Sequence, residues 1–293
     1  MEVGIPGEGG EPPAPRYGAG NVVKWLLAAM ATAPAYLLAQ TLAALVMGIA
    51  LLTTNVEPLS SFAAFSGLVL AVLWWLYLRP RALLRRDEAR PSRPARVAAL
   101  ACALLALGVA LQVAISSALS LVLPLFPQVM ENYLELMELA GITDEMGLIT
   151  FVEIAVLAPL AEEALCRGVA LEFSLRAFCP EWRSAARPEV PAARFWAANV
   201  FQALIFAVMH LNIVQGSYAF FIGLLLGWVM RRTGRLRAAV LLHMAVNAAS
   251  ELMDVLDPLL GGALVPALMV AGIACVVLVR AVACLTAERP RQA

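Results

Sequence analysis

The sequence predicts an all-α membrane protein, a bundle of about eight transmembrane helices. Of the 293 residues, 62 % are hydrophobic and 14 % are charged, whereas a soluble domain is roughly 45–50 % apolar and about 25 % charged. Apolar segments approaching the roughly 20 residues of a spanning helix also recur along the whole chain. A soluble globular fold is therefore excluded, and the net charge of zero gives no indication of a nucleic-acid partner.

The chain divides into four parts. Residues 1–20, rich in Gly and Pro and without an apolar run, are expected to form a disordered tail. Residues 21–147 are expected to hold three spans and an outer amphipathic connector. Residues 148–253 form a core that carries the polar motifs, and residues 254–293 form the last span and a short tail.

Eight apolar segments predict the helices. They are residues 25–52, 59–78, 97–123, 148–175, 195–211, 213–230, 236–250 and 259–285. The fifth, sixth and seventh are short, and the seventh contains His243 and Asn247. We therefore expect these three inside the bundle, shielded from lipid by longer neighbours.

The connector at 128–147 has its own helical pattern. Met130, Tyr133 and Met137 recur at helical spacing, while Glu131 and Glu135 take the other side. This pattern predicts an amphipathic helix on the outer membrane surface. Such a helix either covers a substrate entrance or only connects two spans.

The distribution of basic residues predicts the orientation in the membrane. Lys and Arg collect on the cytoplasmic side of membrane proteins, and all of the 21 except Arg167 fall in alternate connections or at the ends. The segments concerned are 16–24, 79–96, 176–194, 231–237 and 280–291. Both termini are therefore expected in the cytoplasm, and the Arg-rich inner loops suit a prokaryotic cytoplasmic membrane.

Ionisable groups inside a span are costly, so each is expected to have a partner or a function. The fourth span carries Glu162, Glu163 and Arg167. Glu163 and Arg167 are four residues apart, with the acid on the N-terminal side, which favours an ion pair. Glu162 points about 100° away, which predicts a free carboxylate beside a supporting pair.

The two histidines of the chain, His210 and His243, both fall in its apolar C-terminal half. Asn247 follows His243 by one helical turn, so their side chains share a face. Straight helices would put His210 about 24 Å and His243 about 9 Å from the nearest inner arginine, so tilted or shortened helices are needed to bring them together.

With Glu162, these residues suit two kinds of chemistry. A carboxylate and an imidazole can activate water, while a second imidazole and an amide can stabilise an oxyanion. Two histidines and one glutamate, here His210, His243 and Glu162, would equally suit a zinc site with an open position. No cofactor is expected, and zinc is left open.

Three motifs in order resemble those of the CPBP family, the CAAX-type (Abi) intramembrane proteases related to type II CAAX prenyl endopeptidases. The motifs are Glu162-Glu163-x-x-x-Arg167-Gly168, Phe206-x-x-x-His210 and His243-x-x-x-Asn247, with Arg231-Arg232-Thr233-Gly234 before the last. The resemblance covers about residues 148–250, and it makes 148–253 a CPBP-like catalytic core.

The resemblance implies a role for each motif residue. Glu162 would be the catalytic glutamate that activates water with His210. His243 and Asn247 would hold the oxyanion, and Glu163 and Arg167 would support the site. A metal is not required by this glutamate mechanism.

The leading hypothesis is therefore an intramembrane endopeptidase that processes a membrane-associated protein or peptide, by maturation or C-terminal cleavage. A proton-coupled transporter is the alternative, because proton relays also use intramembrane Glu and His. A non-catalytic membrane scaffold or immunity protein is a third. The sequence does not identify the substrate.

Overall fold

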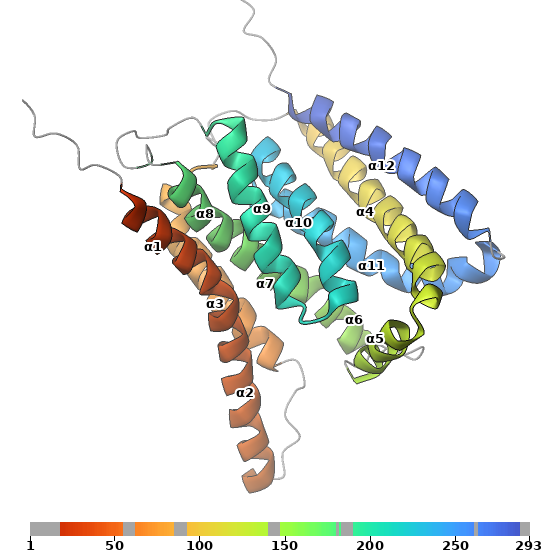
Figure 1. The fold of residues 1–293 in the computed structure, drawn as a ribbon, viewed down its shortest axis with the longest axis horizontal. Coiled ribbons are helices and arrows are strands. Elements are labelled where there is room, and N and C mark those ends of the chain that lie inside the picture. The colour runs from red at the N-terminus through yellow and green to blue at the C-terminus, as the bar shows by residue number, and fades with distance from the viewer. Residues whose placement is uncertain are drawn as a thin grey trace, which may run out of the picture.

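The computed structural model describes residues 18–54, 62–84, 93–139, 147–179, 182, 190–260 and 263–287, and these ranges contain helices and no strand (Figure 1). The helices are α1 (Ala19–Met30), α2 (Thr32–Thr54), α3 (Phe62–Leu78), α4 (Pro94–Val122), α5 (Pro127–Leu139), α6 (Leu148–Val152), α7 (Ala158–Glu163), α8 (Leu171–Phe178), α9 (Ala192–Met209), α10 (Ile213–Thr233), α11 (Leu236–Leu260) and α12 (Leu264–Thr286). Short 3-10 turns, η1 (Arg79–Arg81) and η2 (Leu123–Leu125), end α3 and α4.

Among the residues that the structure describes, five helical stretches are long and apolar enough to cross a membrane, which confirms the all-helical membrane protein. They are Ala19–Ala50, Pro94–Leu125, Ala192–Met209, Ile213–Thr233 and Leu264–Thr286. Helix α3 and the apolar part of α11 are shorter. Eight spans therefore remain a prediction, and the predicted tail at 1–20 lies almost entirely outside the described residues.

Three helices differ from the sequence prediction. The first predicted span bends at Ala31, between α1 and α2. The fourth is not one regular helix, because the π-helical segments η3 (Glu153–Leu157) and η4 (Ala164–Ala170) separate α6, α7 and α8. Helix α11 continues to Leu260 rather than ending near residue 250.

The expected shielding of the short helices from lipid is correct for the apolar part of α11 and wrong in part for α9 and α10. Helices α9 and α10 bury 39 % and 44 % of their most apolar stretch, against 11 % for α12. Leu204, Val208 and Phe221 are nevertheless exposed. The reason is that α9 and α10 pack against each other near the edge of the bundle, where no longer helix covers their outer faces (Figure 1).

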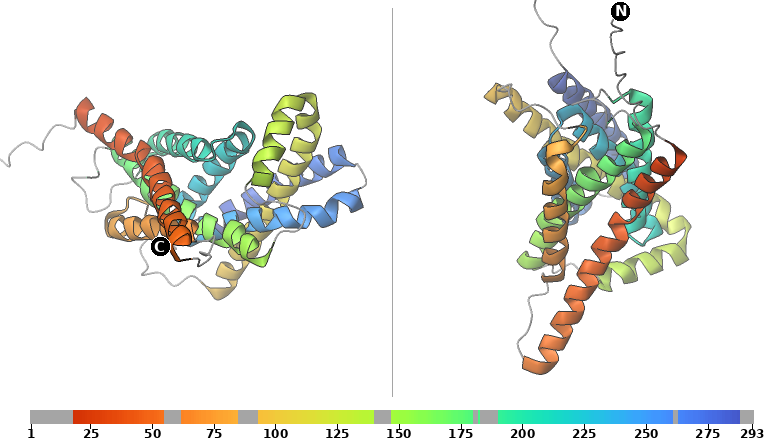
Figure 2. Two further views of the ribbon diagram at one scale, coloured as in Figure 1. Left: turned by 90° about the horizontal axis from the view of Figure 1, so that it is seen from below. Right: turned by 90° about the vertical axis from the view of Figure 1, so that its left-hand side faces the viewer.

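The interrupted helix η3–α7–η4–α8 lies between two groups of helices. Helices α1, α2 and α3 contact it on one side, while α4 packs with α11 and α12 on the other (Figures 1 and 2). A side chain at Gly108 on α4 would come within 2.9 Å of the backbone of Ala245 on α11. Glycine therefore permits the close approach of α4 to the helix that carries His243.

Helix α8 is fixed to the N-terminal helices by a buried ion pair. Arg176 Nε donates to Glu172 Oε1 at 2.7 Å, and the other oxygen of Glu172 accepts from the Leu83 backbone N–H at 2.9 Å. The Arg176 guanidinium also lies over the rings of Trp25 and Trp182. This cluster attaches α1 and the end of α3 to the central helix.

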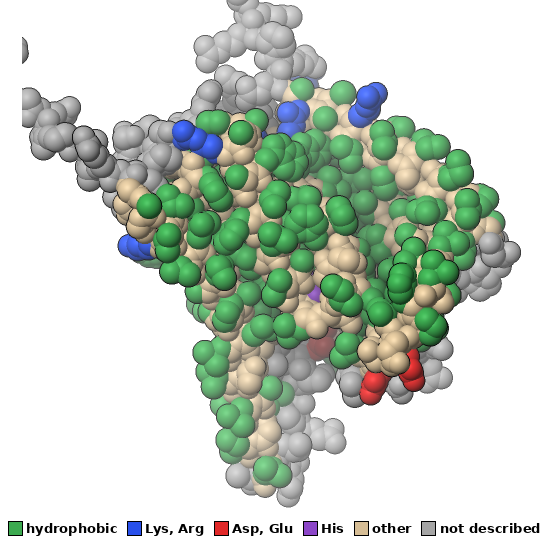
Figure 3. All heavy atoms as spheres, in the orientation of Figure 1, with side chains coloured by type: hydrophobic (Ala, Val, Ile, Leu, Met, Phe, Trp, Pro, Cys, Tyr) green, Lys and Arg blue, Asp and Glu red, His purple; other side chains and the backbone are tan. Residues whose placement is uncertain are grey.

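Basic and acidic side chains lie at opposite ends of the molecule. Figure 3 shows Lys and Arg at one end, and Asp and Glu at the other, where α5 lies. The start of α1 and the end of α12 lie toward the basic end (Figure 1). This distribution agrees with the expected cytoplasmic position of both termini, which stays a prediction.

Candidate active site

The backbone just before α7 lacks one helical hydrogen bond, because Pro159 has no N–H to donate. Just before it the chain is π-helical, and the Ala158 N–H bonds the carbonyl of Glu153, five residues back. The next bond of this kind would need an N–H at position 159, so the Ile154 carbonyl has no donor there. Asn247 Nδ2 on α11 donates to that carbonyl at 3.0 Å. The amide thus holds the segment from which α7 starts.

A buried ion pair lies one turn further along. Arg167 Nη1 donates to Glu163 Oε1 at 2.8 Å, and neither side chain is exposed. The same oxygen lies 2.9 Å from His243 Nδ1. Because an ionised carboxylate only accepts, this histidine nitrogen carries the proton. The expected pair is present, and it also orients a histidine from another helix.

Glu162 points away from this pair, as its position on the helix predicts. Its Oε2 lies 3.7 Å from His243 Nε2, and its side chain is 20 % exposed. That separation is too long for a direct hydrogen bond and is one that a water can bridge. Glu162 is thus the accessible carboxylate of the two.

His210 is positioned by the end of α9. Its Nδ1 lies 2.9 Å from the Phe206 carbonyl. A carbonyl accepts, so this nitrogen carries the proton and Nε2 is left as an acceptor. The next residue, Leu211, has a left-handed backbone with φ of 54°, and Asn212 then caps α10 by accepting from the Val214 and Gln215 N–H groups. This tight turn places His210 in the connection between α9 and α10.

Phe206 lies at the centre of the site. Its ring packs edge to face with both histidine rings, and its centroid lies 4.9 Å from that of His210 and 5.7 Å from that of His243. The Arg167 guanidinium lies over the same ring at 4.3 Å, a cation–π contact. Both histidines therefore lie against one buried aromatic ring.

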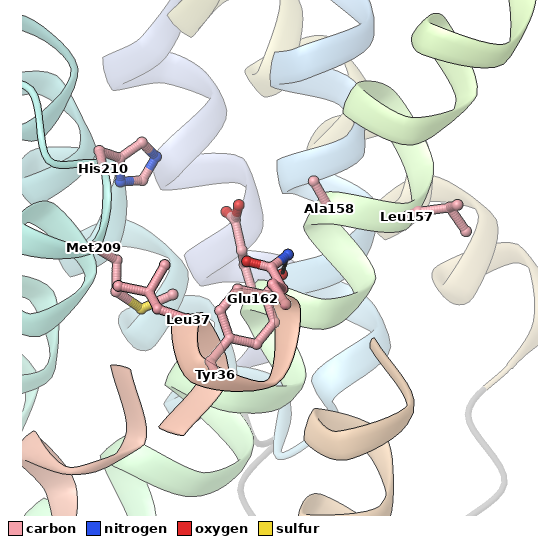
Figure 4. A pocket seen from close by; sticks show the side chains of 8 residues that line it. Tyr36, Leu37, Leu157, Ala158, Glu162, Met209 and His210 are labelled. Atoms are coloured by element: carbon pink, nitrogen blue, oxygen red, sulfur yellow. Dashed lines mark hydrogen bonds between the residues drawn. The ribbon is translucent and has the colours of Figure 1, made fainter. Parts of the chain in front are cut away.

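A cavity of about 190 Å³ opens beside Glu162. Its polar lining is Glu162, His210, Tyr36 and Gln40, and its apolar lining is Leu37, Leu157, Ala158 and Met209. Figure 4 shows Tyr36 and Leu37 of α2 between His210 and Met209 on one side and Ala158 and Leu157 on the other. The volume exceeds the share of a single water, about 30 Å³, and is below the roughly 300–1,000 Å³ of pockets for drug-sized ligands.

The six predicted residues lie in one region but do not all face this cavity. Glu162 and His210 line it, whereas His243 lies between the two glutamates and Asn247 bonds to Ile154. Sequence reasoning missed Tyr36 and Gln40, because nothing in the apolar pattern of the first span marks them. Pro159, a proline inside the fourth predicted span, was the available signal for the π-helical segment η3.

The sequence left a zinc site open. Within the described ranges, no three His, Cys, Asp or Glu side chains are grouped closely enough to hold a metal ion. Each histidine directs Nδ1 to a protein acceptor, Glu163 for His243 and the Phe206 carbonyl for His210, which leaves Nε2 of each without a protein hydrogen bond.

Part of the chain is similar to a known protein family. Residues 144–249 match the family model described as type II CAAX prenyl endopeptidase Rce1-like. The matched segment contains all six predicted site residues and excludes α2. No curated protein and no solved structure matches the chain.

Proposed function

We propose that this protein is an intramembrane endopeptidase that uses water activated by Glu162, because residues 144–249 match the Rce1-like family of type II CAAX prenyl endopeptidases. Its substrate is a membrane-associated protein or peptide. The observation that supports this best is Glu162, the accessible one of the two adjacent carboxylates, which lines a small cavity together with His210.

The reaction follows from that arrangement. Glu162 takes a proton from a water in the cavity while His210 Nε2 accepts the second hydrogen bond of the same water. The resulting hydroxide attacks the scissile carbonyl carbon. The C–N bond then breaks, and Glu162 returns the proton to the leaving amine. General acid–base catalysis of this kind contributes about 10²- to 10⁴-fold in rate.

We propose supporting roles for the buried residues. His243, held by Glu163 through Nδ1, keeps Nε2 3.7 Å from Glu162 Oε2, where a water can donate to both acceptors. Asn247 holds the backbone before α7. This differs from the oxyanion role that the family resemblance implies for both residues.

The membrane surroundings fit a substrate that is itself membrane-bound. The spans expose many large apolar side chains, such as Leu45, Val208 and Val276, which suit contact with lipid. We place the protein in a prokaryotic cytoplasmic membrane, with maturation or C-terminal processing of a membrane-anchored chain as its task.

The test compares host cells that carry the wild-type protein or Glu162→Gln at equal membrane levels. Terminus-resolved mass spectrometry of membrane and secreted proteins is expected to show a defined set that keeps an extra segment in the variant. Glu135→Gln on α5, outside the cavity, is the matched control and is expected to behave as wild type.

Two outcomes bear on the proposal. Unchanged termini in Glu162→Gln, with the wild-type protein folded and present, would contradict proteolysis and favour transport or scaffolding. Purified protein is further expected to cleave the identified substrate at an unchanged rate with a zinc chelator, and inhibition by the chelator would contradict the metal-free mechanism.

A further inference from the structure

The cavity contains a hydroxyl that the proposed mechanism has not used. Tyr36 comes from α2, outside the matched segment 144–249, and its side chain is 6 % exposed. It lines the same cavity as Glu162 and His210 (Figure 4). A phenol there is close to where the scissile carbonyl must lie when Glu162 directs water at its carbon.

The hydrogen bonding of Tyr36 leaves its own proton free. Gln40 Nε2, one turn further along α2, donates to Tyr36 Oη at 3.1 Å. Among the described residues, the Tyr36 side chain makes no other hydrogen bond. Because Oη accepts from the amide, its O–H remains available to a group in the cavity.

The two histidines and Asn247 each direct an N–H to a partner within the protein. Asn247 donates to the Ile154 carbonyl, and His243 Nδ1 donates to Glu163. His210 uses its N–H on the Phe206 carbonyl. Within the described lining of the cavity, Tyr36 carries the hydroxyl group, and hydrogen-bond donors placed at a developing oxyanion supply much of the catalysis in acyl transfer.

The position of the ring is fixed by α3. A Cβ added at Gly67 would lie 2.6 Å from Tyr36 Cε2 and 3.0 Å from Gln40 Cγ. Only glycine leaves room for both side chains at this helix contact. The close packing pre-organises the hydroxyl, as an oxyanion donor requires.

We infer that Tyr36 is a further catalytic residue, which donates its O–H to the scissile carbonyl oxygen, with Gln40 as its positioning residue. The inference rests on the proposed function. The hydroxyl stabilises the negative charge on the tetrahedral intermediate and keeps its proton, which is not consumed when the C–N bond breaks. The catalytic unit then includes α2 as well as the segment 144–249.

The experiment measures kcat and KM of the purified full-length protein in lipid vesicles. The substrate is a quenched fluorescent peptide that spans the bond identified by the comparison of termini. Tyr36→Phe keeps the ring against Gly67 and removes only the hydroxyl, so kcat is expected to fall about 10²- to 10³-fold with KM and the unfolding temperature little changed. Tyr77→Phe, a phenol on α3 that is 71 % exposed, is the matched control.

Gly67→Ala is the second variant, because it displaces the ring and keeps the hydroxyl. Its kcat is expected to fall as well. Wild-type kcat in Tyr36→Phe, with Glu162→Gln inactive, would overturn the inference and leave the proposed function standing. Equal and negligible cleavage by wild type and Glu162→Gln would overturn both.

Discussion

At the scale of single residues, two adjacent glutamates have different surroundings. Glu163 is fully buried and bonded to Arg167 and His243, whereas Glu162 is 20 % exposed and faces a cavity. The difference follows from the helix, which turns consecutive residues about 100° apart. One carboxylate can therefore stabilise the site while its neighbour reacts.

Asn247 offers a residue-scale prediction. Removing its amide in Asn247→Ala leaves the Ile154 carbonyl without a donor, and an unsatisfied buried acceptor costs about 1–3 kcal/mol. Both the unfolding temperature in detergent and kcat are expected to fall. Asn247→Asp, whose ionised side chain cannot donate, is expected to show the same loss.

The control for Asn247 is a double-mutant cycle with Pro159. Pro159→Ala returns a backbone N–H, so Asn247→Ala is expected to cost less stability in that background than in wild type. An unchanged unfolding temperature in Asn247→Ala, together with reduced kcat, would instead indicate the oxyanion role.

At the scale of helices, the contact between α4 and α11 positions His243. A side chain at Gly108 would collide with Ala245, two residues from His243. We expect Gly108→Ala to push α11 away, to cost about 1–3 kcal/mol of stability as overpacking does, and to reduce kcat. Thermal unfolding and peptide cleavage measure the two effects.

The matched control for Gly108 is Gly48 on α2, where an added Cβ meets nothing within 4 Å. Gly48→Ala is expected to leave activity unchanged and to be neutral or stabilising, by up to about 1 kcal/mol from helix propensity. Equal stability of the Gly108 and Gly48 variants would contradict the close approach of the two helices.

Helical periodicity and charge spacing predicted much at this scale. The spacing of Glu163 and Arg167 gave the ion pair, and the apolar segments gave most helices. The π-helical segments could not be predicted from periodicity, and η3 is held by a donor from α11, Asn247, that lies far away in the sequence. Tyr36 also escaped prediction, since its role depends on which helix packs beside α7.

At the scale of the whole molecule, charge separation predicts the orientation in the membrane. Glu131 on α5, the helix at the acidic end, and Arg237 in the first turn of α11 are both exposed (Figure 3). In a variant with the five cysteines replaced by alanine, Glu131→Cys is expected to react with an impermeant maleimide in intact cells. Arg237→Cys is expected to react only after the membrane is opened.

The labelling also tests the number of crossings. The reverse pattern, with Arg237→Cys labelled from outside, would contradict cytoplasmic termini. Labelling of both positions in intact cells would contradict an odd number of crossings between them. Reactivity of both in opened membranes is the control that each thiol is accessible.

The π-helical segment η4 also makes the orientation of α8 depend on the number of residues before it. Its closing hydrogen bond joins the Leu171 N–H to the Cys166 carbonyl, five residues back rather than four. Deleting one residue there would restore an α-helix and rotate α8 by about 100°, so Glu172 and Arg176 would turn away from Leu83 and the two tryptophans. Over evolution this stretch is therefore expected to keep its length, without insertions or deletions.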